Sequence, residues 1–139
     1  MRACDISLSS LLPSQEYLTV EKVELLRVST APLPPIVTLP YGYSSLILDG
    51  HHRAAAYYRR GALHVPALVV ESDVDIPKLN PREGCWFCIP TIEQLLDKYF
   101  SEWYPECRDA GIESFYDLLI RNNLNSIPKG VPSRAYAEL

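Results

Sequence analysis

The chain has 139 residues, of which 47% are hydrophobic and 22% charged, and these proportions are those of one ordinary globular domain. They exclude a disordered tail, a coiled coil and a collagen-like fibre, and no apolar run is long enough for a membrane span. The net charge of −4 does not favour a nucleic-acid binder, because such proteins take most of their affinity from basic surfaces. We expect a cytoplasmic protein that binds small molecules or other proteins.

The sequence predicts a strand, a helix, two strands, a helix, a strand and then further helices. Twelve prolines divide the chain, since each fixes its own backbone and removes a hydrogen-bond donor. Ser14 is the expected N-cap of the first helix, and Gly61 is expected to end the second. This order indicates an α+β fold with a small mixed sheet and a helical C-terminal extension. The predicted strands are 5–12, 36–39, 44–48 and 67–70, and the predicted helices are 16–28, 52–60, 91–103 and 114–122.

An acidic, proline-containing segment, 71–84, is predicted to be a loop and is the best internal boundary of the chain. Residues 1–72 are therefore expected to form a core. Residues 73–139 are expected to form a loop and a helical extension packed on the same domain. The net charge is +1 over residues 1–70 and −5 over residues 71–139, so no basic surface is expected on the extension.

Four cysteines raise the question of metal or redox chemistry. Cys85 and Cys88 have the two-residue gap of zinc ribbons and of redox motifs. A structural zinc site needs four ligands, usually two such pairs, and the second pair is missing here. Buried apolar packing, zinc binding and thiol chemistry all stay open, with packing favoured by the incomplete ligand set.

The chemistry-bearing stretch is Asp49-Gly50-His51-His52-Arg53, which follows an apolar strand and opens a helix. Gly50 allows a sharp turn, and the first helical turn offers unpaired N–H groups and the positive end of the helix dipole. Together these features predict an anion site, to which Arg53 adds a planar donor fork suited to phosphate. His51 and His52 can donate, accept or carry a proton near neutral pH, and Asp49 could orient a histidine or bind Mg²⁺. The alternative is that Asp49 is only an N-cap and both histidines are exposed helix-start residues.

This motif, with the strands around it, resembles the signature of the ParB/sulfiredoxin superfamily over about residues 5–72. The wider pattern includes the Pro13–Glu16 segment that opens the first helix and the strand that begins at Val65. A later set of residues is similar to short bacterial ParB-like proteins of unassigned function. That set is Trp103, Cys107, Gly111-Ile112 and Asp117-Leu118.

The motif distinguishes between branches of the superfamily. Sulfiredoxins carry a cysteine where this chain has His51, and partition ParB proteins, which bind CTP, carry Gly-Glu-Arg-Arg in this place. The free-serine kinase branch has Asp-Gly-His-His-Arg and is the most similar. That branch places a catalytic glutamate at the position of Gln15, with Glu16 one residue later here.

The resemblance implies a nucleotide-binding protein that transfers phosphate to a small hydroxyl substrate or hydrolyses the nucleotide. The nucleotide would be ATP or ADP, with CTP as a further option, and Mg²⁺ would accompany it. By resemblance, Gly50, His51, His52 and Arg53 would bind the nucleotide, Glu16, Asp49 and His51 would act in catalysis, and Asp49 would bind the metal. The alternatives are a non-enzymatic nucleotide- or DNA-binding regulatory module and a ParB-like nuclease. A homodimer is left open.

Overall fold

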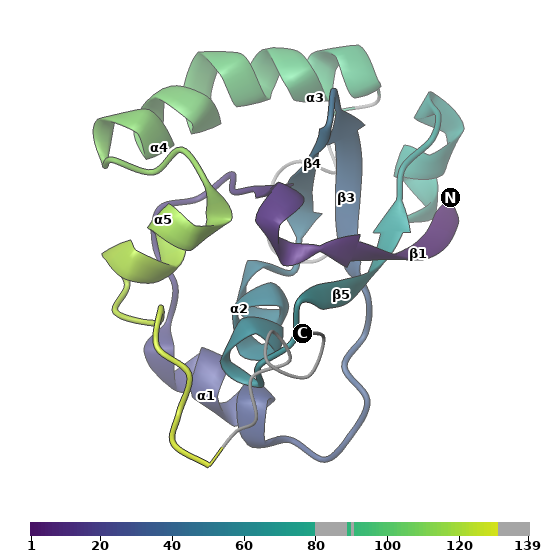
Figure 1. Ribbon diagram of the computed structural model, residues 1–139. Coiled ribbons are helices and arrows are strands. Elements are labelled where there is room, and N and C mark those ends of the chain that lie inside the picture. Colours follow the sequence, from purple (N-terminus) through teal and green to yellow (C-terminus); the bar gives the residue numbers. More distant parts are fainter. Residues whose placement is uncertain (80–88, 90, 131–139) are drawn as a thin grey trace.

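The computed structural model describes residues 1–79, 89 and 91–130. Five strands form one sheet in the order β1-β5-β3-β4-β2, with helices on both of its faces (Figure 1). The α+β fold class and the mixed sheet predicted from the sequence are confirmed. The strands are β1 (Arg2–Ser7), β2 (Leu11–Leu12), β3 (Ile36–Tyr41), β4 (Ser44–Asp49) and β5 (His64–Val69). The helices and helical turns are η1 (Leu8–Ser10), α1 (Val20–Val28), α2 (His51–Arg59), η2 (Asp73–Lys78), α3 (Ile92–Lys98), η4 (Tyr99–Trp103), α4 (Tyr104–Asp109) and α5 (Phe115–Arg121).

The sheet is mixed because hairpin and crossover connections alternate. β3 and β4 are antiparallel neighbours joined by a tight turn at Gly42, whose φ is +59°. β5 returns through α2 to lie parallel to β3, and β1 pairs with β5 antiparallel. The predicted first strand is divided in the structure: β1 lies at one edge of the sheet and the short β2 pairs with β4 at the other.

Alternating side chains of the central strands feed two hydrophobic cores, as strand geometry requires. Ile36 and Ile47 point to the core beneath α1, α2 and α5. Leu46 and Leu48 point to the opposite core, which η2, α3 and η4 cover. Three fully buried alanines, Ala54–Ala56, let α2 pack closely in the first core. The carboxyl end of β4 is thereby fixed directly before the start of α2.

Two predicted helices differ from the observed ones. The first begins at Val20 rather than at residue 16, and its N-cap is Thr19, not Ser14. The helix predicted to end at Trp103 instead continues through a π-helical turn, η4, into α4. Pro105 cannot donate to the carbonyl four residues back, and the wider π turn accommodates the missing bond without ending the helix.

No helix within the described parts of the chain is long and apolar enough to cross a membrane. Cys85 and Cys88, and with them the question of a zinc or redox site, lie outside the described residues. Cys4 and Cys107 are free cysteines.

Candidate functional site

The turn between β4 and α2 requires glycine at position 50. Its φ is +106°, in the left-handed region that other residues rarely adopt. A Cβ atom there would lie 2.6 Å from Cγ2 of Ile36, a core residue of β3. Gly50 therefore sets the direction in which α2 leaves the sheet, and with it the position of the three side chains that follow.

His51 is buried and accepts a hydrogen bond from the loop that precedes α1. The backbone N–H of Ser14 donates to its Nε2 over 3.0 Å, and the Ser14 hydroxyl donates to the carbonyl of Ile47 over 2.8 Å. Burial lowers the pKa of His51 from 6.5 to about 3, with a smaller contribution from His52. Because Nε2 accepts, the neutral ring carries its proton on Nδ1. His51 thus ties the loop to the strand end as a neutral group.

His52 makes the matching contact at the other end of the same loop. The backbone N–H of Thr19 donates to its Nε2 over 3.0 Å. Partial burial lowers the pKa of His52, and the ammonium group of Lys22 lowers it further. Thr19 is the N-cap of α1, so this one hydrogen bond joins the starts of α1 and α2. The pair of histidines therefore holds the 13–19 loop across the amino-terminal end of α2.

Arg53 is turned towards the protein rather than towards solvent. Its Nη1 donates to the carbonyls of Pro34 and Pro35 over 3.1 and 2.8 Å, and its Nη2 donates to the Asp49 carboxylate over 3.1 Å. Its side chain is only 9% exposed. The guanidinium therefore secures the segment before β3 and the last residue of β4. The sequence led us to expect Arg53 as a donor to phosphate and did not predict these hydrogen bonds to the protein itself.

The helices α1 and α2 run parallel, which no feature of the sequence predicted. At their starts they meet through Thr19 and His52, as described above. At their ends Arg60 donates to the carbonyls of Leu26, Arg27 and Ser29, which close α1. An ion pair between Arg59 and Glu24 also links the two helices. Their positive dipole ends therefore lie side by side.

The positive ends of two helix dipoles and the ammonium group of Lys22 lie at this end of the helix pair, together with the acidic Glu21 in the first turn of α1. Each helix N-terminus is equivalent to roughly half a positive charge. The Thr19 side chain makes no capping bond within the described structure, so it leaves the first N–H groups of α1 without that partner. Lys22 lies close enough to affect the charge of His52, and the two histidines are themselves neutral. The arrangement can stabilise an anion. Lys22 and the start of α1 are the parts of the site that sequence reasoning missed.

Glu16 and Gln15 lie on the 13–19 loop, between the two contacts with the histidines. The amide group of Gln15 donates to the carbonyl of Tyr17 over 2.8 Å, so it folds back on its own loop. The backbone carbonyl of Glu16 accepts from Asn122 over 3.1 Å. Its carboxylate contributes to raising the pKa of Cys107, so this charge lies towards α4. Glu16 is thus on the same segment as the motif contacts, with its charge on the α4 side.

The residues around Asp49 do not fit a dedicated Mg²⁺ site. Asp49 is already paired with Arg53, and the described residues contain no group of three His, Cys, Asp or Glu side chains that could hold a metal ion. Mg²⁺ is usually held by one or two carboxylates together with phosphate oxygens and water. Any Mg²⁺ here would therefore have to be held mainly by a ligand's own phosphates.

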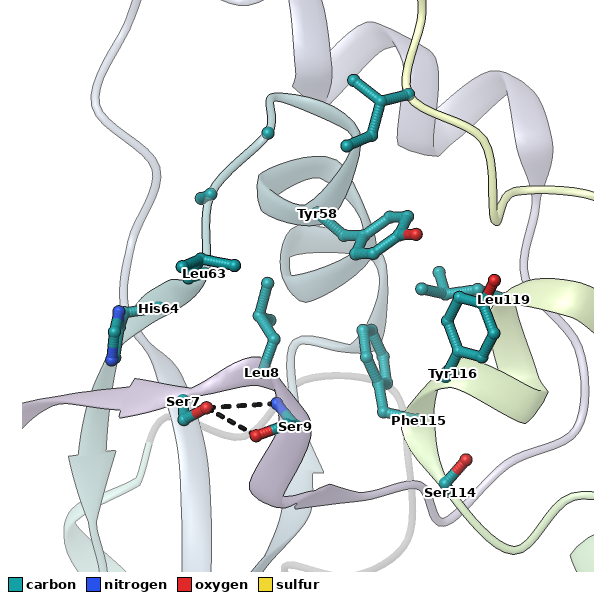
Figure 2. A pocket seen from close by; sticks show the side chains of 13 residues that line it. Ser7, Leu8, Ser9, Tyr58, Leu63, His64, Ser114, Phe115, Tyr116 and Leu119 are labelled. Carbon is teal, nitrogen blue, oxygen red and sulfur yellow. Dashed lines mark hydrogen bonds between the residues drawn. The ribbon is translucent and has the colours of Figure 1, made fainter. Parts of the chain in front are cut away.

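A cavity of about 750 Å³ lies at the carboxyl-terminal end of α2, opposite the motif. Figure 2 shows Leu8, Phe115 and Tyr116 around it, with Tyr58 of α2 above and the imidazole of His64 directed away from the space. Tyr58 is seven residues from His51, which places the two ends roughly 10 Å apart along the helix. This cavity is apolar and contains none of the residues of the motif.

Comparisons with known proteins give structural likenesses only. No protein-family model matches the chain, and no curated protein matches it. A conserved hypothetical protein from Pyrococcus furiosus is 26% identical with a TM-score of 0.46, over 51% of this chain and 33% of that one. This chain therefore spans about a third of the length of the Pyrococcus protein.

Two further solved structures are similar at lower identity. Protein Atu1540 from Agrobacterium tumefaciens is 19% identical with a TM-score of 0.44, over 80% of this chain and 70% of that one. The C-terminally truncated chromosome-partitioning protein ParB from Caulobacter crescentus, complexed with CTP-γ-S, is 18% identical with a TM-score of 0.46. That match covers 98% of this chain and 84% of the ParB chain. Likenesses at these TM-scores assign neither a family nor a ligand to this chain.

Proposed function

We propose that the chain binds the phosphate groups of a nucleotide at the adjoining amino-terminal ends of α1 and α2. The observation that carries the proposal is the hydrogen bond from Thr19 N–H to His52 Nε2, which holds two parallel helix starts together beside Lys22. Backbone N–H groups and aligned dipoles at a helix start bind phosphate in many proteins. The resemblance of Asp49–Arg53 to the nucleotide-binding motif of the ParB/sulfiredoxin superfamily supports the same ligand class.

The motif residues have a specific division of labour in this proposal. Gly50 and Arg53 shape the turn, and His51 fastens the loop to it. Phosphate oxygens are received by the N–H groups of the two first helical turns and by Lys22. His52 is half-buried, and its Nδ1–H, left by the acceptor role of Nε2, is a further donor for a phosphate oxygen in this proposal. Mg²⁺ arrives with the nucleotide and is held by its phosphates.

Thermal unfolding of the whole chain with ATP, ADP, CTP and GTP, each with and without Mg²⁺, tests the proposal. A nucleotide at a hundred times its dissociation constant stabilises the fold by about 2.7 kcal/mol, which raises the Tm by several degrees. Lys22→Ala should weaken the stabilising nucleotide about three- to tenfold, because it removes a charge next to the phosphates. Lys129→Ala, the same change at an exposed lysine beyond the far end of α2, is the matched control. Equal affinities of the two variants would contradict the site.

Phosphoryl transfer to a small hydroxyl substrate is the second candidate, supported by the resemblance of Asp49–Arg53 to the motif of the free-serine kinase branch. It requires the Glu16 carboxylate to turn from the α4 side, where its charge lies, towards the phosphates. In that reaction the substrate oxygen attacks the terminal phosphorus, its proton passes to the Glu16 carboxylate, and the shortened nucleotide leaves. Glu16→Gln should abolish turnover while the nucleotide-induced rise in Tm stays unchanged. A variant that retains full turnover would exclude Glu16 as the base. Binding without turnover in the unaltered protein would leave a nucleotide-binding module.

A further inference from the structure

A second pocket, of about 240 Å³, lies between the end of β3 and the helical segments η4 and α4. Four of the residues that line it are aromatic: Tyr41, Tyr99, Phe100 and Tyr104. The ring centroids of neighbouring pairs are 5.1–6.2 Å apart, in edge-to-face or tilted contacts. Two of these four aromatic residues, Tyr99 and Phe100, belong to the π turn η4, a rare helical form that is frequent at functional sites. The pocket is thus a concave aromatic surface on an unusual piece of backbone.

Carboxylates outnumber cations around this pocket, where the one guanidinium that an aromatic contact places beside its described lining is that of Arg108. Glu113 lines it, and none of the described residues that line it is a lysine or an arginine. Cys107, at its buried side, has a pKa raised to about 11 by burial and then by the carboxylates of Glu16 and Glu106. The thiol is therefore protonated at neutral pH and is not a nucleophile. Burial likewise raises the pKa of Tyr99 to about 12, so this ring stays uncharged at neutral pH.

We propose that this pocket binds a small alkylated ammonium cation, of the size of choline. The faces of aromatic rings attract cations, and a quaternary ammonium group is the cation that needs no hydrogen bonds. Tyr104 already receives a cation at one face, since the guanidinium carbon of Arg108 lies 5.7 Å from its ring centroid. The volume of about 240 Å³ is below the range of roughly 300–1,000 Å³ for drug-sized ligands, which favours a compact head group.

The charge of the ligand distinguishes the proposed cation from a neutral molecule of the same shape. An apolar pocket of the same shape would take a neutral molecule of equal size as well as a cation. The aromatic lining and the three nearby carboxylates, against the single guanidinium of Arg108, favour the cation. The comparison of choline with 3,3-dimethylbutan-1-ol, which has the same shape and no charge, isolates this difference.

Isothermal titration of the whole chain with these two probes is the test. Choline should bind saturably and at least about tenfold more tightly than the neutral alcohol. Glu113→Gln, at an exposed residue, should weaken choline about threefold or more and leave the alcohol unchanged. Glu93→Gln, the same change at an exposed position outside the pocket, is the matched control. Phe100→Leu should weaken choline more than the alcohol, and circular dichroism checks its fold.

Three results would overturn the proposal. The first is equal affinity for choline and the neutral alcohol, and the second is no saturable binding of choline. The third is a peptide with a trimethyllysine that binds at least tenfold more tightly than choline, which would assign the pocket to a protein partner. Glu113 and Phe100 are not part of the proposed nucleotide site at the starts of α1 and α2. Nucleotide-induced stabilisation of the same variants is therefore measured separately, and its outcome tests the nucleotide site alone.

Discussion

The two ends of α2 carry basic residue types whose side chains form hydrogen bonds in opposite directions. At its start, His51 and His52 accept N–H groups from the preceding loop and are neutral. At its end, Arg60 donates to three carbonyls that close α1, and Arg59 pairs with Glu24. Cations thus gather at the negative dipole end, where they are favoured, and neutral rings at the positive end. The first turn of α2 has no acidic residue of its own, Asp49 before it is paired with Arg53, and the acidic neighbour at this end is Glu21 in the first turn of α1.

Among the variants considered, Gly50→Ala should destabilise the amino-terminal end of α2 most. The new Cβ would lie 2.6 Å from Ile36 in a backbone with φ of +106°, so both strain and overpacking oppose it. We expect a loss of about 3 kcal/mol in the free energy of unfolding, or roughly 10 °C in Tm. Gly42→Ala, at a positive φ with open space around it, should cost about 1–2 kcal/mol. Equal losses in thermal unfolding would show that backbone strain alone, and not the contact with Ile36, fixes the turn.

Arg53→Ala should come next in size. It removes the hydrogen bonds to the carbonyls of Pro34 and Pro35 and the ion pair with Asp49, all made by a buried guanidinium. We expect a loss of about 3 kcal/mol in urea-induced unfolding, against about 1–2 kcal/mol for Arg60→Ala at the other end, because Arg53 is buried and Arg60 is half-buried. A variant that keeps its stability within about 0.5 kcal/mol but loses nucleotide binding would instead identify Arg53 as a phosphate ligand.

The sequence predicted the central hairpin and α2 because their signals are local. The apolar runs around 36–39 and 44–48 match β3 and β4, and three alanines followed by Gly61 match α2. It also predicted that Asp49–Arg53 would lie together at a strand end, which a contiguous motif guarantees. These parts need no knowledge of distant neighbours.

The missed parts depend on contacts between distant residues. Ser14 is a residue type typical of an N-cap, but its N–H and hydroxyl are used by His51 and by Ile47. The N-cap is therefore Thr19, five residues later than expected, and the helix begins at Val20. The inward direction of Arg53 depends on the path of Pro34 and Pro35. Lys22 becomes part of the site only because α1 and α2 run parallel. The division at residue 72 and the catalytic role of Glu16 stay predictions.

The neutral histidines give the amino-terminal end a pH dependence that the other end lacks. His51 has a pKa of about 3 in the fold and about 6.5 when unfolded. The unfolded chain therefore binds the extra proton between these values, so stability is full above pH 6.5 and falls as the pH decreases towards 3. From pH 7.5 to 5.5 we expect His51 to account for a loss of about 1.4 kcal/mol in urea unfolding.

His51→Gln tests whether His51 causes this loss of stability, since an amide oxygen can still accept from Ser14 but does not titrate. The loss between pH 7.5 and 5.5 should shrink by about 1.4 kcal/mol in this variant, whatever its stability at pH 7.5. His64→Gln, at an exposed histidine, should keep the full loss. An unchanged pH slope in His51→Gln would mean that another group causes the acid sensitivity.

The smallest effect expected is that of Ser14→Ala, which removes the hydroxyl contacts with the Ile47 carbonyl and with His51 Nε2 and keeps the backbone bond to His51. The hydroxyl of Ser14 donates to the Ile47 carbonyl over 2.8 Å in a partly buried place, so its loss should cost about 1 kcal/mol. Ser126→Ala removes a hydroxyl that only accepts from Arg59 over 3.3 Å at the exposed far end, and should cost less than about 0.5 kcal/mol. Because the loop also carries Glu16 and the N-cap of α1, Ser14→Ala should loosen nucleotide binding more than its small effect on stability suggests. If both serine variants lose the same stability and nucleotide affinity is unchanged, the 13–19 loop is held by the histidines alone.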